Sequence, residues 1–257
     1  MKLKFASVLF TLLVFSGVLT AQADELQTID VLEPNEVTTL VDEVGLTEDE
    51  INDFPVEVLR ELIQNDAKKI SFQPVTPTAS LSDKDVKVGA SAFEVKSDKA
   101  GQKKMYLYGN FEWIKNPSER YTDAMSIGWP DSAELAAPIV NNKISQFEGK
   151  YMYRDGPNSA FGWQTGTSTT TPNSDTGLAG VGFKFGFKSG IGFSEHKGYI
   201  GQYVYTKKDK GLFTIMIRYG HGTITWIPSF TVYPNFGLGV TPNPAMATKD
   251  AYATLSW

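Results

Sequence analysis

Carboxylates and aromatic side chains are interleaved between Phe111 and Glu134, a composition that suits sugar chemistry. The residues concerned are Glu112, Trp113, Glu119, Tyr121, Asp123, Trp129, Asp131 and Glu134. A glycoside hydrolase needs two carboxylates that face each other across the sugar. The alternative interpretation is that the aromatic residues fill a β-sandwich core and the acids line its solvent side. We predict a candidate ligand site formed by Trp113, Tyr121, Trp129, Glu112 and Glu134, with glycan hydrolysis as one hypothesis for its use.

A second pattern is the stretch GVGFKFGFKSGIGF at residues 180–193. Its glycines fit no phosphate-binding loop, because Phe185 or Glu195 stands where a dinucleotide fingerprint needs its third glycine, and no Gly-Lys pair precedes Ser or Thr. Apolar residues instead alternate with glycine or lysine, which predicts an amphipathic β-strand. Its apolar face suits either a protein core or a membrane. The candidate contacts with a membrane or an anionic surface are Phe183, Lys184, Phe185, Phe187 and Lys188.

The chain has no cysteine and only two histidines, His196 and His221. The absence of cysteine excludes thiol catalysis, thiolate metal sites and disulfides, and a multi-histidine zinc site is not expected. No G-x-S-x-G motif accompanies the histidines. Both histidines stand in short polar or glycine-flanked stretches that predict exposed turns. We therefore expect no catalytic residue, no metal and no cofactor.

Lysines with Phe and Tyr between them raise the question of nucleic-acid binding. Residues 101–257 contain 15 basic and 11 acidic residues, a net charge of +4. This excess is well short of a basic nucleic-acid footprint, so we expect no nucleic-acid partner. An envelope polymer or glycan, or an anionic membrane surface, is a better candidate partner, and solvated lysines in turns are the alternative explanation.

The N-terminus predicts export. Lys2 and Lys4 precede a mostly apolar run over residues 5–19, and Ala21 and Ala23 form an A-x-A cleavage motif. This is the order of a secretory signal peptide, and the run is shorter than the roughly 20 residues of a membrane-spanning helix. We predict a signal peptide over residues 1–23, cleaved after Ala23, and a secreted protein.

An acidic segment over residues 24–72 is predicted to form short amphipathic helices. Between residues 24 and 100 there are 18 acidic and 7 basic residues, a net charge of −11. Val37, Leu40 and Val44 lie on one helical stripe, and Thr47 with Glu50 fits a capping box. We treat this segment as a candidate pro-region. Residues 73–100, with two prolines and many small polar residues, are predicted to be a linker.

Short runs rich in Tyr, Phe, Trp, Ile, Val and Thr follow one another over residues 101–257, separated by Gly, Pro, Asn and Asp. Such runs without helical spacers predict an antiparallel fold. We predict a mainly β protein, an antiparallel β-sandwich at residues 101–257 preceded by the small acidic helical segment.

Three functions are compatible with these features. The leading hypothesis is a secreted, non-enzymatic bacterial protein whose β-sandwich binds a component of the cell envelope or the surroundings. The alternatives are a membrane-active toxin or bacteriocin-like antimicrobial protein, and a glycan hydrolase. The layout of signal peptide, acidic helices and cysteine-free β domain resembles that of exported proteins of Gram-positive bacteria.

Overall fold

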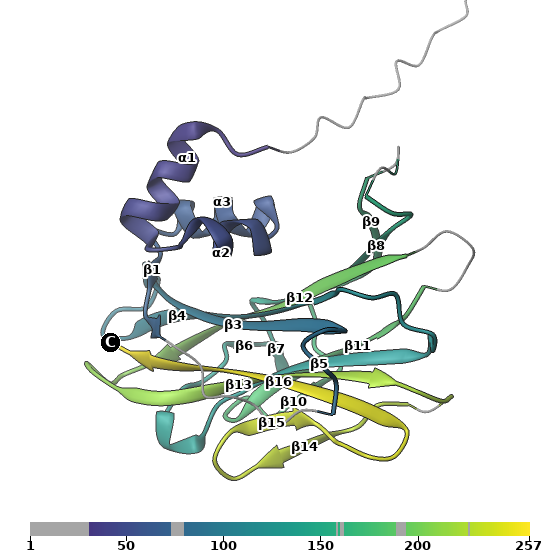
Figure 1. Ribbon diagram of the computed structural model, residues 1–257. Coiled ribbons are helices and arrows are strands. Elements are labelled where there is room, and N and C mark those ends of the chain that lie inside the picture. The colour runs from purple at the N-terminus through teal and green to yellow at the C-terminus, as the bar shows by residue number, and fades with distance from the viewer. Residues whose placement is uncertain (1–30, 73–79, 158, 160–161, 189–193, 226) are drawn as a thin grey trace, which may run out of the picture. The chain divides into compact units, whose positions relative to one another are not determined.

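Two six-stranded antiparallel sheets form most of the computed structural model (Figure 1). The structure describes residues 31–72, 80–157, 159, 162–188, 194–225 and 227–257. The predicted signal peptide, part of the predicted linker and residues 189–193 of the glycine-rich stretch lie outside the described residues. Residues Leu32–Trp257 form one compact unit. No helix in the described part of the chain is long and apolar enough to cross a membrane.

The two sheets differ in which strands they contain but share the antiparallel arrangement. In spatial order, the first sheet contains β1 (Lys68–Lys69), β3 (Val86–Val95), β4 (Lys103–Trp113), β12 (Glu195–Thr206), β8 (Phe147–Arg154) and β9 (Gln164–Thr169). The second contains β10 (Ser174–Asp175), β11 (Gly180–Gly186), β5 (Thr122–Gly128), β13 (Leu212–Gly222), β16 (Met246–Ser256) and β2 (Ser71–Phe72). The predicted mainly β fold with antiparallel sheets is confirmed.

A core of aliphatic and aromatic side chains from both sheets lies between them. Two glycines show how closely the sheets approach: a Cβ on Gly109 would lie 2.6 Å from Ile217, and one on Gly149 would lie 2.9 Å from Phe183. The predicted amphipathic strand is β11. Its alternate residues Val181, Phe183 and Phe185 are buried in this core, as expected for a strand with a period of two.

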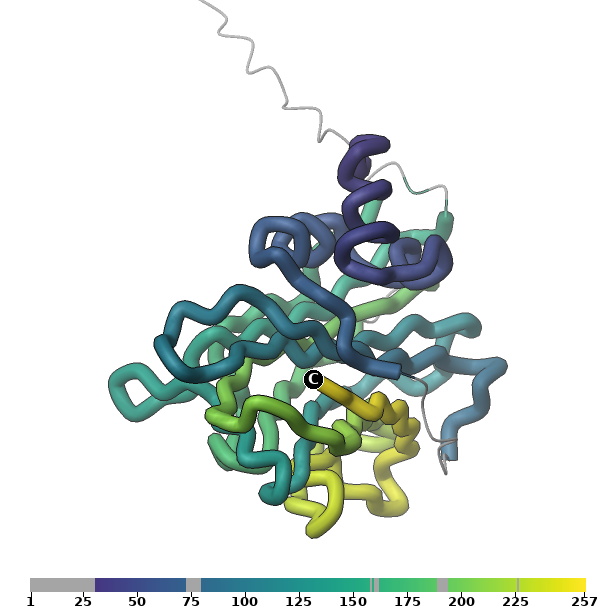
Figure 2. Tube along the Cα trace, turned by 90° about the vertical axis from the view of Figure 1, so that its left-hand side faces the viewer, coloured from purple at the N-terminus to yellow at the C-terminus, as the bar shows by residue number. Residues whose placement is uncertain are grey.

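The acidic segment forms a layer of short helices on the outer face of the first sheet (Figures 1 and 2). The elements are α1 (Pro34–Thr39), the π-helical turn η1 (Leu40–Val44), α2 (Glu48–Asp53) and α3 (Val56–Gln64). The predicted capping box at Thr47 and Glu50 is present. Leu40, Leu59 and Leu62 pack against aromatic residues of the sheet, including Phe93 and Tyr106.

Two hairpins and a short 3-10 helix complete the structure. The hairpin of β6 (Ile139–Val140) and β7 (Lys143–Ile144) follows the 3-10 helix η2 (Asp131–Ala133). The hairpin of β14 (Phe230–Tyr233) and β15 (Gly237–Val240) lies on the outer face of the second sheet, where the Leu238 amide donates to the Ala179 carbonyl at 2.7 Å.

The predicted linker over residues 73–100 is wrong for residues 86–95. These residues form β3, a 10-residue strand that pairs with β4 along its whole length. Val86, Val88 and Ala92 contribute to the core between the sheets, and Phe93 supports the helices on the other face. The small residues of the run GASA have weak strand propensity, so the partner strand rather than local preference defines this element.

The chain crosses from one sheet to the other within five residues. After β1 has paired with β3, the amide of Ile70 donates to the Ala92 carbonyl of the first sheet at 3.0 Å. The carbonyl of the same residue accepts from the Ser256 amide of the second sheet at 3.1 Å. β2 then pairs with β16, so the segment from Lys68 to Phe72 joins the two sheets at one side of the sandwich.

Candidate functional site

The structure separates the five residues of the predicted ligand site. Glu112 and Trp113 are consecutive on β4, so their side chains leave opposite faces of the sheet. Glu112 is exposed on the outer face, whereas Trp113 lies in the core and its Nε1 donates to the Tyr219 hydroxyl at 2.7 Å. Trp129 is fully buried and donates to the Leu135 carbonyl at 3.3 Å. These tryptophans support the fold.

Glu134 and Tyr121 lie elsewhere. Glu134 follows η2 and forms an ion pair with Lys208 at 3.0 Å, beyond one end of β12. Glu112 is the cross-strand neighbour of Lys197 near the other end. At about 3.3 Å per residue, these ends are roughly 30 Å apart, whereas a glycosidase needs its carboxylates within about 10 Å. The structure therefore does not bring Glu112 and Glu134 together. Tyr121, 39% exposed, precedes β5.

The predicted membrane contacts divide between the core and the surface. The side chains of Phe183, Phe185 and Phe187 are buried between the sheets. Lys184 lies on the other side of the strand, with its ammonium group 5.6 Å from the ring centroid of Phe230. Lys188 follows the end of β11, and its ammonium group lies 5.5 Å from the ring centroid of Tyr153 on the first sheet. The alternation was predicted correctly, and its apolar face belongs to the protein core in this fold.

The prediction that both histidines are exposed in turns is wrong, because both face the core. His221 Nδ1 lies 3.0 Å from Asp123 Oδ1. Asp123 also accepts hydrogen bonds from the Tyr219 hydroxyl and the Gly222 amide. Burial raises the pKa of Asp123, and the hydrogen bond with His221 opposes that rise.

The second histidine lies close by. His196 Nδ1 is 2.9 Å from the Tyr151 hydroxyl, and the ring of Phe187 is 4.1 Å from His196 and 5.8 Å from His221 between centroids. An Asp–His pair can orient an imidazole as a base, but His221 is only 3% exposed and closed to a substrate. The alternation of Ile217, Tyr219 and His221 along β13 was the sequence signal for this burial.

A surface hollow lined by charged and polar residues lies on the outer face of the first sheet. It has two adjoining parts that share Asp53, Asn110 and Glu112. The open part has a volume of about 240 Å³ and is also lined by Asp83, Lys87, Val88 and Gly89. The inner part, about 60 Å³, reaches Tyr108, Met152, Lys197 and Tyr199 beside the end of α2. We call the two parts together the α2 cleft.

Opposite charges alternate across the α2 cleft. Lys87, Glu112 and Lys197 are direct cross-strand neighbours on β3, β4 and β12, so they form a row with a spacing of about 5 Å. Desolvation lowers the pKa of Lys197, and Glu112 opposes this change. Desolvation raises the pKa of Asp53, and Lys87 opposes this change. The cleft thus offers ammonium donors and carboxylate acceptors side by side.

Tyr108 lines the inner part of the α2 cleft and has an unsatisfied hydroxyl that is buried beneath it. Its ring stacks on Phe54 with centroids 4.2 Å apart, and the side chain is 1% exposed. Its hydroxyl has no hydrogen-bond partner among the described residues. Burial raises the pKa of Tyr108 well above its usual value, so the hydroxyl stays protonated and can both donate and accept. A buried polar group of this kind is costly to leave unpaired.

Trp163 lies beside Lys197, which lines the α2 cleft. Lys197 Nζ lies 4.3 Å from the ring centroid of Trp163, and Arg154 Cζ lies 4.6 Å from it. Arg154 also forms an ion pair with Glu195. Cations over an indole ring are attracted by its negative face, so Trp163 helps to position Lys197 at the cleft.

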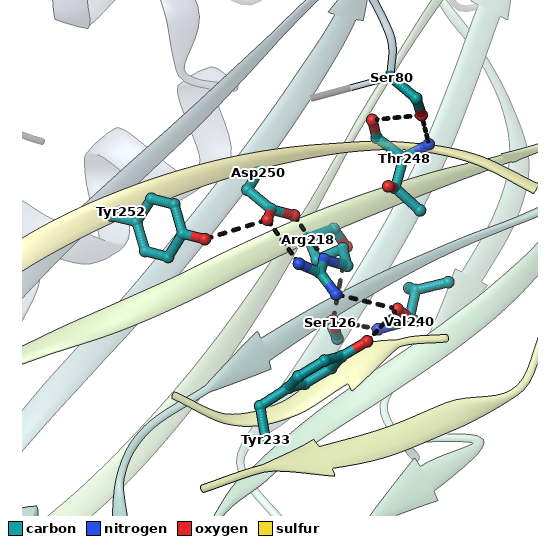
Figure 3. A network of polar contacts seen from close by, with 8 residues as sticks. All are labelled: Ser80, Ser126, Arg218, Tyr233, Val240, Thr248, Asp250 and Tyr252. Carbon is teal, nitrogen blue, oxygen red and sulfur yellow. Dashed lines mark hydrogen bonds and ion pairs between the residues drawn. The ribbon is translucent and has the colours of Figure 1, made fainter. Parts of the chain in front are cut away.

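A polar network on the second sheet has a structural role (Figure 3). Arg218 forms two hydrogen bonds with Asp250, one of them 2.6 Å from Nη2 to Oδ2, and its Cζ lies 4.7 Å from the ring centroid of Tyr233. The arginine also donates to the Val240 carbonyl at 3.4 Å. These contacts attach the β14–β15 hairpin to the second sheet. The guanidinium and carboxylate charges satisfy each other, so neither is left for a ligand.

Comparisons with known proteins give only a distant likeness. No protein-family model and no curated protein matches the chain. Clostridium perfringens delta-toxin is similar at a TM-score of 0.37 and 11% identity, over 74% of this chain and 90% of that one. The membrane-inserted form of the Clostridium perfringens NetB toxin is similar at a TM-score of 0.37 and 10% identity, over 74% of this chain and 97% of that one. A pore-forming protein is similar at a TM-score of 0.35 and 10% identity, over 72% of this chain and 90% of that one. A likeness at this level does not identify what this chain binds.

Proposed function

We propose that this chain is a secreted, non-enzymatic protein that binds a component of the cell envelope or the surroundings through the α2 cleft. The observation that carries the proposal is the row of Lys87, Glu112 and Lys197, whose opposite charges lie side by side on three paired strands along the cleft. A ligand with both donors and acceptors can pair with these groups. Export rests on the predicted signal peptide.

The setting of this charged row favours binding. Lys87, Glu112 and Lys197 project from three paired strands, and residues on a rigid sheet hold their spacing when a ligand arrives. Asn110 donates to the Asp53 carbonyl at 3.1 Å, which fixes the end of α2 against the sheet. The donors and acceptors are therefore positioned before the ligand binds, which lowers the entropic cost of association.

Co-sedimentation of the purified protein with isolated cell envelopes and insoluble extracellular polymers tests the proposal. We expect the wild-type protein to sediment and the Lys197→Gln and Glu112→Gln variants to bind less. Glu134→Gln makes the same chemical change at the other end of β12 and should bind as the wild type does. Absence of binding to every preparation would reject the proposal, and a loss confined to Glu134→Gln would move the site.

Membrane activity is the second candidate, and the contacts of the acidic helices favour it. Glu57 of α3 pairs with Lys150 of β8 at 2.6 Å, and Glu61 accepts from the Tyr203 hydroxyl at 2.6 Å. The acidic layer thus covers aromatic and basic groups of the first sheet, as a masking segment would. Dye release from anionic liposomes, measured before and after limited proteolysis, tests this candidate. No leakage in either state would reject it.

A further inference from the structure

We infer that one end of the sandwich is a docking surface for an anionic lipid membrane. The loops of this end, which we call the hairpin end, are residues 96–102, 129–146, 176–179 and 207–211. The inference goes beyond the proposed function and does not depend on the α2 cleft, which lies near the other end of β12. Its basis is a group of exposed aliphatic side chains beside exposed lysines, on loops that the fold holds in place.

The β6–β7 hairpin presents aliphatic side chains to solvent. Ile139 and Val140 are 64% and 58% exposed, and Leu178 is 64% exposed. A Cβ on Gly177 would lie 4.0 Å from Ile139 Cδ1, and the Gly177 carbonyl accepts from the Ala137 amide at 3.0 Å, so the loop of Leu178 adjoins the hairpin. Single exposed aliphatic residues are common, whereas a group of them marks an interaction surface.

Backbone geometry fixes the position of this hairpin. The two residues of its turn, Asn141 and Asn142, have φ angles of 52° and 60°, which a tight hairpin turn requires. At the base of the hairpin, the Ser145 amide donates to the Pro138 carbonyl at 2.8 Å. The aliphatic side chains are therefore held outside the core before any partner arrives, which lowers the entropic cost of binding.

The turn between β12 and β13 adds lysines to the hairpin end. Lys208 pairs with Glu134 at 3.0 Å, which attaches the turn to the segment that precedes the hairpin. Lys207 and Lys210 are exposed and form no ion pair among the residues that the structure describes, and the same holds for Lys143 on the hairpin. These ammonium groups are available to an anionic partner.

The hairpin end carries a positive charge. Its loops contain six basic and four acidic residues, a net charge of +2. One of the acids, Asp98, also lies within 3.5 Å of the ammonium group of Lys104 on β4. Leu212, 70% exposed, directly follows the basic turn, so an aliphatic side chain stands beside the lysines there as well.

An anionic membrane supplies both kinds of partner over one extended surface. Its phosphate headgroups attract lysines, and the hydrocarbon below the headgroups takes up aliphatic side chains. The aliphatic hairpin and the basic turn lie on separate loops of one end, so a broad surface can meet them together. A soluble polyanion would pair with the lysines and leave Ile139, Val140 and Leu178 in water.

Flotation with lipid vesicles tests the inference. One set of vesicles contains phosphatidylcholine alone, and the other contains equal parts of phosphatidylcholine and phosphatidylglycerol. We expect the protein to float with the anionic vesicles and to bind them more weakly at high salt, because salt screens the lysines. Absence of binding to the anionic vesicles, or equal binding to both sets, would overturn the inference.

Variants locate the contact on the molecule. Ile139→Thr and Lys207→Gln should each weaken binding to the anionic vesicles roughly fivefold. Ile227→Thr and Lys84→Gln are the matched controls, because both residues are exposed and lie at the other end of the sandwich. Both controls should bind as the wild type does. Unchanged binding by both Ile139→Thr and Lys207→Gln would overturn the inference.

Two further outcomes would assign the hairpin end to another partner. In analytical ultracentrifugation, an oligomeric wild-type protein that Ile139→Thr converts to a monomer would make it an interface between copies. Binding of soluble alginate as tight as that of the vesicles, weakened by Lys207→Gln and unaffected by Ile139→Thr, would make it a site for anionic polymers. Each of these outcomes would overturn the membrane inference.

Variants of the α2 cleft separate this inference from the proposed function. Glu112→Gln and Lys197→Gln should bind the anionic vesicles as the wild type does, and Ile139→Thr should still bind lipid-free extracellular polymers. Loss of vesicle binding in the cleft variants would place the lipid contact at the cleft and overturn the inference. Polymer binding without vesicle binding would reject the inference alone, and vesicle binding without any polymer binding would leave it standing.

Discussion

Asp123 is a fully buried carboxylate, and its partners set the cost of substitutions around it. His221, Tyr219 and the Gly222 amide all bond to it. Removing one partner of a buried hydrogen bond typically costs about 1–3 kcal/mol, because the other group stays behind in the core. We therefore expect His221→Gln to lower the free energy of unfolding by about 2 kcal/mol, as measured by urea denaturation.

A double-mutant cycle checks that explanation. Asp123→Asn removes the carboxylate that His221 faces, and the double variant removes both members of the pair. If the pair acts as a unit, the loss in the double variant is smaller than the sum of the two single losses. Strictly additive losses would show that the two residues contribute independently.

Glu148 makes stability depend on pH. Burial raises the pKa of Glu148, hydrogen bonds from Tyr106 and Tyr199 oppose the rise, and the charge of Glu61 adds to it. The folded state therefore holds this proton more tightly than the unfolded chain does. Its contribution to stability is fully present below the unfolded pKa of about 4.3 and is lost as pH rises through the folded value.

The substitution Glu148→Gln isolates this contribution. The amide is neutral at every pH, so the variant should gain stability relative to the wild type as pH rises from about 4 to 7. Denaturation curves recorded across this range give the difference in unfolding free energy, in which the contributions of the other carboxylates cancel. A difference that does not vary with pH would contradict the assignment.

Among the structural elements, the β14–β15 hairpin is held in part by one arginine. Arg218 contacts Asp250, Tyr233 and the Val240 carbonyl, and the Asp250 side chain is only 3% exposed. Arg218→Ala leaves that carboxylate buried without its counter-charge, with only the Tyr252 hydroxyl bonded to it, so we expect a loss of about 3 kcal/mol in unfolding free energy. Faster amide hydrogen exchange in Gly237–Val240 should accompany it.

Arg154→Ala is the matched control for the arginine. Its ion pair with Glu195 is about a quarter exposed on both sides, and pairs at the surface contribute at most about 1 kcal/mol. Equal losses in the two variants, or unchanged exchange in the hairpin after Arg218→Ala, would contradict the role given to Arg218.

Elements whose apolar residues recur at a regular spacing can be predicted from the sequence. Elements whose conformation depends on a neighbouring strand cannot. β11 and the acidic helices carry regular apolar spacing, and both were predicted. The sequence predicts a linker where β3 lies, because its small residues show little preference without β4 beside them. It predicts turns at the two histidines, because polar neighbours in sequence hide the strand alternation that buries them.

The α2 cleft could not be predicted as a unit. Its residues come from α2, β3, β4 and β12, and only the docking of the helices on the first sheet brings them together. Glu112 was singled out for its carboxylate and lies in the cleft. Tyr108 resembled any core aromatic residue, since an unpaired hydroxyl is a property of packing and has no signature in the sequence.

For the whole molecule, the sandwich needs residues that precede position 101. The 101–257 fragment lacks β3, and with it Val86 and Ala92 of the core between the sheets. We expect this fragment to lack cooperative unfolding and near-ultraviolet circular dichroism. A cooperatively folded 101–257 fragment would show that β3 is dispensable.

The fragment 80–257 is the matched comparison. It keeps β3 but uncovers Tyr106, Tyr199 and other aromatic residues on which the helices pack. We expect it to unfold cooperatively and to bind a hydrophobic dye that the longer protein does not bind. A fragment that fails to unfold cooperatively would show that the helical layer is needed for the sheets themselves.

The crossing at Ile70 has a consequence for self-association. An open sandwich presents unpaired backbone at the margins of its sheets, and such margins recruit strands from other molecules. On one side, the Ile70 amide and carbonyl bond to both sheets and occupy that backbone. The opposite margins are β9 and β10, and β9 is an uncharged run of Gln, Gly, Ser and Thr. Strand addition between copies of this protein is thus directed to the β9 side, where nothing in the sequence of the strand repels a second copy.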